Sequence, residues 1–219
     1  KVLKICENAF LRCDKLAKIE IPLNSNLQTI KKYAFSWSNI DEIYFPSSLK
    51  ELKERWCYGT INLKKITISP SNNKFIMKDK KYLLGKTDPN NNKFDNLLFT
   101  VRDIEKISIP SNIKIISSDS YHHCKNLKKI EILPNSNLQI IGPCAFSESN
   151  IEEIFIPPKV TKICENAFER CQKLAKVEIS PNSNLQIIES NAFSNSKIEA
   201  IFIPPKVSKI CKEAFLKCF

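Results

Sequence analysis

Cysteine and histidine are the side chains of this sequence with the greatest potential for chemistry. There are nine cysteines, and the two histidines, His122 and His123, stand directly before Cys124. Imidazole nitrogens and thiolates are ligands that zinc prefers. Adjacent side chains generally point apart, however, and no carboxylate or further ligand stands at helical spacing from this cluster. We therefore expect a structural variant of one repeat here, with no metal site and no cofactor.

The cysteines follow a repeat more closely than they follow a metal or disulfide pattern. One position of the internal repeat holds a cysteine only in the longer of two kinds of repeat unit (coil): Cys13, Cys124, Cys171 and Cys218. Adjacent coils of a stacked sheet are about 4.8 Å apart, so cysteines of alternate coils are roughly 10 Å apart, beyond the reach of a disulfide at about 7 Å. Three pairs could still bridge within one coil: Cys6/Cys13, Cys164/Cys171 and Cys211/Cys218. The alternative is that they are buried free thiols that act as small apolar fillers.

Known catalytic patterns are otherwise missing. Glycine occurs three times, which disfavours phosphate-binding glycine loops, and no serine stands in a G-x-S-x-G sequence. The carboxylate pairs, such as Glu152-Glu153 and Asp41-Glu42, recur with the repeat. Their positions are therefore explained by the repeated fold more than by catalysis. We expect a protein that is not an enzyme. The formal charge of +11 favours anionic partners in general and identifies none.

Internal repetition is the strongest signal in the chain. Val2–Asn26 and Val160–Asn184 are nearly identical, and so are Leu138–Lys159 and Leu185–Lys206. The repeat units, which we call coils, alternate between 25 and 22 residues in length. Two consecutive coils therefore form a longer repeat of 47 residues. Chains with such periods form solenoids in which each coil contacts its neighbours. We expect about eight coils in an α/β solenoid that covers residues 1–219 as one domain.

Two motifs predict the structure of each coil. L-x-x-I-x-I, as in Leu174–Ile179, alternates apolar and polar residues and predicts one short strand, so the stacked coils should form a parallel sheet on a concave face. An apolar pair three apart follows, such as Val160 and Ile163. Ala-Phe, as in Ala167-Phe168, then predicts one short helical turn on the convex side, with the Phe packed inward.

One coil carries an insert at residues 69–90. Lys74–Lys78 and Tyr82–Lys86 are apolar-rich runs on either side of Asp79-Lys80, which predicts a β-hairpin. The hairpin is either a decorative loop or a flap that grips a partner. The sequence begins and ends within the pattern, so we expect a fragment of a longer chain, with either neighbouring repeats in the parent chain or end-to-end self-association at its open ends. It has no apolar run near 18 residues, and we expect no membrane insertion in this fragment.

The arrangement A-F-x-x-C-x-x-L-x-x-I-x-I-P resembles the BspA-like leucine-rich repeats. Ala9-Phe10, Cys13, Leu16, Ile19 and Ile21-Pro22 match it in order. The resemblance covers essentially the whole chain. It departs at two pairs that replace Ala-Phe, Trp56-Cys57 and Ser120-Tyr121, and at Asn91–Arg102, where the repeat is weakest. It implies a surface or secreted protein of mucosal bacteria or protists that attaches to host-cell or extracellular-matrix proteins. A cytoplasmic location stays open, because the cysteines look reduced.

The outward positions of the predicted strands form the candidate binding face. Its residues are Lys18, Glu20, Tyr44, Lys129, Glu131, Glu153, Phe155, Lys176, Glu178 and Phe202. Lys often falls beside Glu of the next coil, which contributes about 0.2–1 kcal/mol per pair. The aromatic residues Tyr44, Phe155 and Phe202 would expose apolar area with no gain in folding, which is typical of protein interfaces. The alternative is that lysine stems cover them.

A basic edge offers an alternative site for anionic glycans. Four lysines recur near the loop that follows each strand: Lys159, Lys162, Lys206 and Lys209. Nucleic acid is not expected, because the edge has neither a recognised motif nor aromatic residues for base stacking. A structural spacer is the remaining alternative.

Overall fold

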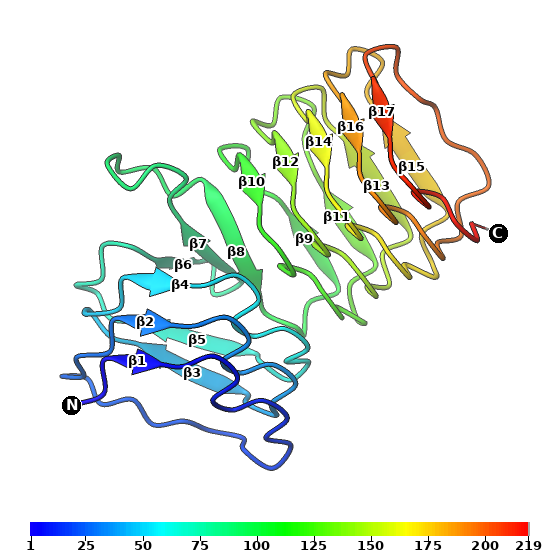
Figure 1. Cartoon of the computed structure of the whole chain (residues 1–219). Helices are drawn as coiled ribbons and strands as arrows, with labels where there is room; N and C mark the ends of the chain where they lie inside the picture. The colour runs from blue at the N-terminus through cyan, green and yellow to red at the C-terminus, as the bar shows by residue number, and fades with distance from the viewer. Residues whose placement is uncertain (219) are drawn as a thin grey trace. The chain divides into compact units, whose positions relative to one another are not determined.

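The computed structural model describes residues 1–218, which consist of strands and turns and contain no α-helix (Figure 1). The chain divides into two units, one of residues 1–94 and 99–102 and the other of residues 95–98 and 103 onward. Over both units the repeat makes about nine coils of a parallel-strand solenoid, against the eight expected. The solenoid is thus confirmed, whereas a single domain over residues 1–219 stays a prediction.

The first unit contains two parallel ladders and a hairpin. Its strands are β1 (Lys4–Ile5), β2 (Thr29–Ile30), β3 (Glu42–Phe45), β4 (Glu51–Leu52), β5 (Lys65–Ile68), β6 (Ile76–Lys78) and β7 (Tyr82–Gly85). The predicted strands form the first ladder, in which β3 pairs in register with β5. Ile43 and Phe45 of β3 are buried while Glu42 and Tyr44 reach the surface, as period-two alternation requires. A second ladder has the order β1-β2-β4.

The same two ladders are longer in the second unit. Its strands are β8 (Asn96–Thr100, whose first residues belong here), β9 (Lys106–Ser108), β10 (Ile115–Ile116), β11 (Lys129–Glu131), β12 (Ile140–Ile141), β13 (Glu153–Ile156), β14 (Lys162–Ile163), β15 (Lys176–Ile179), β16 (Ile187–Ile188) and β17 (Lys209–Ile210). The first ladder runs β9-β11-β13-β15 and the second β8-β10-β12-β14-β16-β17 (Figure 1). We refer to the outward side of the first ladder as the first-ladder face.

The second ladder was not predicted from the sequence. Its strands mostly hold two residues, such as Lys162–Ile163 and Ile187–Ile188, and pair in register from coil to coil. Ile163 and Ile188 are fully buried, so the apolar pair of each coil supplies one inward residue of this ladder. Two residues are too few to show the alternation by which a strand is recognised.

The predicted helical turn is wrong, and with it the α/β description. The segment around each Ala-Phe pair is a run of β-turns with two left-handed residues, which in one coil are Asn166 (φ 56°) and Arg170 (φ 55°). A left-handed residue ends an α-helix. Backbone N–H groups alternate instead, so that Ala167 donates to Cys164 within the coil and Phe168 to Ala192 of the next coil. A third line of hydrogen bonds therefore joins neighbouring coils on this turn side.

In residues 1–218, accordingly, no helix is long and apolar enough to cross a membrane.

The phenylalanines of the Ala-Phe pairs pack inward, as predicted, and their rings also stack on one another, which was not predicted. In the second unit Phe146, Phe168 and Phe193 are fully buried, and the ring of Phe168 lies 5.1 and 5.0 Å from its two neighbours in nearly parallel planes. Tyr121 continues this stack although it departs from the motif. In the first unit the Trp56 ring meets Phe35 edge-on. Each coil thus contributes one aromatic ring to the core, either the Phe of the Ala-Phe pair or a residue that replaces it.

The insert folds as an antiparallel hairpin of β6 and β7. Three residues connect the paired Lys78 and Tyr82. Of these, Asp79 and Lys80 have positive φ, and the N–H of Lys81 donates to the carbonyl oxygen of Lys78. All residues of β7 are buried, so the hairpin packs against protein along this strand. Asn72 precedes it and is itself buried. Its amide donates to the carbonyl oxygens of Pro46 and Leu49, and its oxygen accepts from the backbone N–H groups of Lys74 and Phe75.

The nine cysteines all lie within residues 1–218 and are free thiols. Cys171 is fully buried, and its Sγ donates to the carbonyl oxygen of Phe146 at 3.0 Å. Burial raises the pKa of Cys171 to about 12 and that of Cys164 to about 11. Both groups therefore stay in the unreactive thiol form at neutral pH.

We expect a thiol reagent at pH 8 to modify the exposed Cys6 in the folded protein and to leave Cys164 and Cys171 unmodified until denaturant is added. Peptide mass mapping of the labelled sites measures this. The assignment of Cys171 to the core would be refuted by its labelling at the same rate as Cys6 without denaturant.

Candidate functional site

The first-ladder face of the first unit carries a depression of about 440 Å³. Lys18, Glu20 and Tyr44, three of the residues predicted to bind, all line it. Tyr44 lies on β3, Lys18 forms an isolated parallel bridge with Glu42 of that strand, and Glu20 follows Lys18 by two residues outside any strand. The wall also includes Leu23, whose side chain is largely exposed. Sequence reasoning missed Leu23, although an apolar residue directly after the strand-ending proline was a usable signal.

Glu42 is the electrostatic centre of this depression. Its carboxylate lies 3.0 Å from the ammonium of Lys18 and 3.2 Å from that of Lys65, which belong to the coils on either side. Hydrogen bonds from Lys18 and then Lys65 hold the pKa of Glu42 below its usual value, and the hydrogen bond with Glu42 raises the pKa of Lys18. Glu42 and Lys18 are therefore both charged near neutral pH.

The first-ladder face of the second unit carries its own depression of about 270 Å³. Six predicted residues line it: Lys129, Glu131, Glu153, Phe155, Lys176 and Glu178. In the register Glu153 lies beside both Lys129 and Lys176, and Phe155 lies beside Glu178. The nearest ion pairs are Lys129–Glu153 at 3.7 Å and Lys176–Glu178 at 3.3 Å. The result is an aromatic ring surrounded by alternating charges.

Two positions depart from the predicted face. Phe202 is 55% exposed, but it lies in no strand and lines neither depression. Lys106 pairs with Lys129, which places like charges side by side in the coil where the sequence repeat is weakest. In the structure the residues predicted to bind a partner therefore form one group in each unit, and Phe202 belongs to neither group.

The charged side chains of these depressions are better suited to binding a partner than to transferring a proton in catalysis. A general acid near pH 7 needs a carboxyl group with a raised pKa, whereas the pKa of Glu42 is lowered. Carboxylates and ammonium groups held in pairs can bind the opposite charges of a partner surface, and an aromatic side chain among them supplies apolar contact.

The four lysines of the predicted basic edge form two columns. Lys159 and Lys206 lie in loops and donate to the side-chain oxygens of Asn137 and Asn184, each at 2.6 Å. Lys162 and Lys209 lie instead in the second ladder, on β14 and β17.

In the second column, Lys162 pairs with a carboxylate of the next coil. Glu189 lies 2.7 Å from the ammonium of Lys162, and this hydrogen bond raises the pKa of the lysine. Burial alone would raise the pKa of Glu189, but hydrogen bonds from Lys162 and from the Glu165 N–H outweigh it and lower that pKa. Lys162 is thus partly neutralised, and a polyanion site on this edge stays a prediction.

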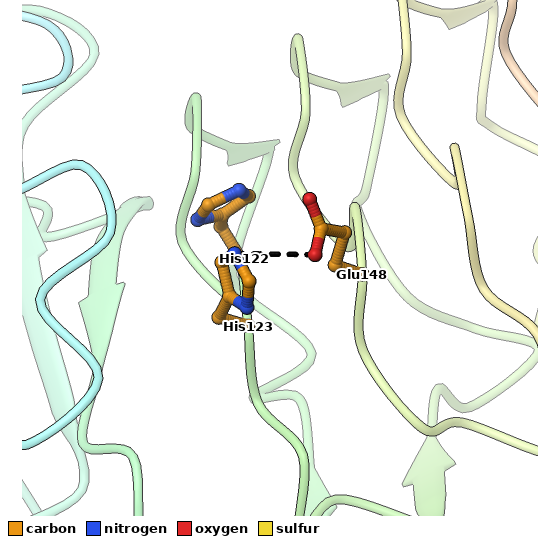
Figure 2. A group of neighbouring side chains, drawn as sticks. All are labelled: His122, His123 and Glu148. Carbon is orange, nitrogen blue, oxygen red and sulfur yellow. Dashed lines mark ion pairs between the residues drawn. The ribbon is translucent and has the colours of Figure 1, made fainter.

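A third group of side chains lies on the turn side of the second unit. His122 and His123 lie close to Glu148, and Nε2 of His123 is 3.3 Å from Oε2 of Glu148 (Figure 2). Glu148 belongs to the coil after that of the histidines, so helical spacing within one coil does not reveal it. The usable signal was the coil length, since Glu148 stands 25 residues after His123.

Comparison with solved structures supports the fold. The chain is similar to a leucine rich cell surface protein from Faecalibacterium prausnitzii A2-165, with 18% identity and a TM-score of 0.68, over 96% of this chain and 57% of that one. A leucine-rich repeat protein from Eubacterium ventriosum gives 20% and 0.61, over 96% and 66%. The pneumococcal vaccine antigen PcpA gives 22% and 0.64, over 93% and 59%. The chain thus spans less than two thirds of each.

Family membership rests on the sequence. No curated protein matches the chain significantly. The model of the BspA type leucine rich repeat region, by contrast, matches residues 1–79 and 92–219 in six copies. Those residues include every strand of both ladders that the structure describes. The chain belongs to the BspA-type leucine-rich repeat family.

Proposed function

We propose that this chain is a non-enzymatic binding module that attaches to a host-cell or extracellular-matrix protein through its first-ladder face. The resemblance to the BspA-type family implies a surface protein, and one solved neighbour is a leucine rich cell surface protein, which together suggest a protein-binding or adhesion role and a place at the cell surface. Attachment to a protein of the host is our inference from that family and from the face described above.

One observation carries the proposal. Each unit has a depression on its first-ladder face, and each depression places one aromatic residue, Tyr44 or Phe155, among paired charges. Alternation alone accounts for the outward direction of these positions, but it does not account for aromatic residues there. Tyr and Phe are enriched at protein interfaces, where charged surroundings add specificity.

We expect Tyr44→Ala and Phe155→Ala each to weaken binding to cultured epithelial cells or to purified matrix proteins at least about fivefold, because a central interface side chain is worth more than 1 kcal/mol. Binding of the fluorescently labelled chain, measured over a concentration series, gives the affinity. Unfolding curves establish that both variants keep the stability of the wild type.

Two further variants sharpen this test. Ile61→Ala removes an exposed apolar side chain that lines neither depression, and it should bind as the wild type does. Phe202→Ala removes an exposed phenylalanine outside the depressions and should also bind normally, which separates the depressions from the whole predicted column. Unchanged binding of both Tyr44→Ala and Phe155→Ala to every surface that holds the wild type would refute the proposal.

A further inference from the structure

His122, His123 and Glu148 form a compact set of potential metal ligands on the turn side of the second unit. One ligand atom of each lies within 4.8 Å of the others. His122 is buried, and the side chains of His123 and Glu148 are mostly covered, with exposed fractions of 14% and 25%. Figure 2 shows the His123 ring next to the Glu148 carboxylate, with the His122 ring adjoining it. The histidine rings are 4.3 Å apart and nearly perpendicular.

The backbone of two neighbouring coils holds this set in place. The N–H of Tyr121 donates to the carbonyl oxygen of Ala145, and the N–H of His123 donates to that of Ser147. These hydrogen bonds flank the three side chains and fix the coil of the histidines beside the coil of the carboxylate. His123 and Glu148 share a left-handed backbone, each with φ of 58°. They therefore project from equivalent positions of consecutive coils.

We propose that His122, His123 and Glu148 bind a zinc ion that links these two coils. Two imidazole nitrogens and one carboxylate oxygen are a donor set that zinc uses in proteins, with water as the fourth ligand. Imidazole favours zinc and similar transition metals over magnesium and calcium, which prefer oxygen donors. Donor atoms that already lie within 4.8 Å need small side-chain movements to reach a common ion.

Two cations near Glu148 bear on this site. The Nζ atom of Lys125 and an Nη atom of Arg170 each lie 3.8 Å from a carboxylate oxygen of Glu148. Both side chains are more than half exposed, and both contacts are longer than a hydrogen bond. Lys125 and Arg170 can turn toward solvent when zinc binds. In the absence of zinc, they partly neutralise the Glu148 carboxylate. The site is on a different side of the coil from the first-ladder face, so the two proposals are independent.

The test measures zinc affinity on the whole chain. Metal is first removed with a chelator, and accessible thiols are alkylated because exposed cysteines such as Cys6 also bind zinc. Calorimetric titration with zinc chloride should give one bound ion per chain, and zinc should raise the melting temperature. His123→Gln and Glu148→Gln should each lower the affinity at least about tenfold, since weaker perturbations around metal sites already have that effect.

Glu189→Gln is the matched control, because Glu189 is a partly exposed carboxylate paired with a lysine of the preceding coil. It should bind zinc as the wild type does. Cobalt(II) in place of zinc reports the ligands, since thiolate coordination gives a strong near-ultraviolet charge-transfer band that imidazole and carboxylate do not. The proposal is overturned by no zinc binding after alkylation, by a thiolate band on the bound ion, or by unchanged affinity in both ligand variants.

Discussion

Replacing Phe168 with alanine should lower the free energy of unfolding by about 3–5 kcal/mol, which is the usual cost of deleting a buried phenylalanine. The Phe168 ring is fully buried and stacks on Phe146 and Phe193 at 5.1 and 5.0 Å. Its removal leaves a cavity and ends two aromatic contacts at once. Chemical denaturation followed by circular dichroism measures the change. Because each coil is stabilised mainly by its neighbours, the transition should also broaden.

Phe155→Ala is the matched control for Phe168→Ala. It removes the same side chain from the same unit, but Phe155 lies on the first-ladder face and lines the depression there. We expect it to cost less than about 1 kcal/mol, as is usual for substitutions outside the core. Equal losses in the two variants would contradict the role of the aromatic stack.

Asn72→Ala should lower the free energy of unfolding by about 2–4 kcal/mol, because four hydrogen bonds at about 1 kcal/mol each are lost. The buried Asn72 amide uses all its donors and acceptors, with two bonds to Pro46 and Leu49 and two from Lys74 and Phe75. Alanine would leave these backbone groups buried without a replacement. The change is measured by denaturant unfolding, and faster proteolysis should accompany it within residues 69–90.

Asn137→Ala provides the comparison for Asn72→Ala. The Asn137 side chain is exposed and accepts one hydrogen bond, from Lys159. Its removal should change stability by no more than about 0.5 kcal/mol. If Asn72→Ala unfolds at the same denaturant concentration as Asn137→Ala, Asn72 does not anchor the hairpin.

The first ladder was predictable because alternation in L-x-x-I-x-I specifies which side chains are inside. Ile154 and Ile179 are buried as expected, and Phe155, which follows Ile154 on β13, reaches the surface. The turn side was not predictable in the same way. Glu-Asn-Ala-Phe has the local composition of a helical turn, but hydrogen bonds to the neighbouring coil replace those of a helix. Asn166 and Asn191 were a neglected signal, since asparagine tolerates the left-handed backbone that both adopt.

The candidate site was predictable to the extent that it depends on a single strand position. Lys18, Glu20 and Tyr44 share a depression because the repeat places Lys18 beside Glu42, in an isolated bridge next to β3. Phe202 occupies the corresponding sequence position, yet no strand forms there. Contacts between different coils, such as His123 with Glu148, depend on the length of the intervening coil and on backbone geometry that a residue pattern does not contain.

The alternation of 22- and 25-residue coils restricts how genes of this kind can change in length. Duplication of residues 138–184, a segment of 47 residues, would place Lys176 beside a new copy of Glu153 and preserve the order of charges. Duplication of a single coil would instead place like charges side by side, as at Lys106 and Lys129. Unequal crossing-over should therefore be tolerated best in steps of two coils, so that natural variants would differ in reach by multiples of roughly 10 Å.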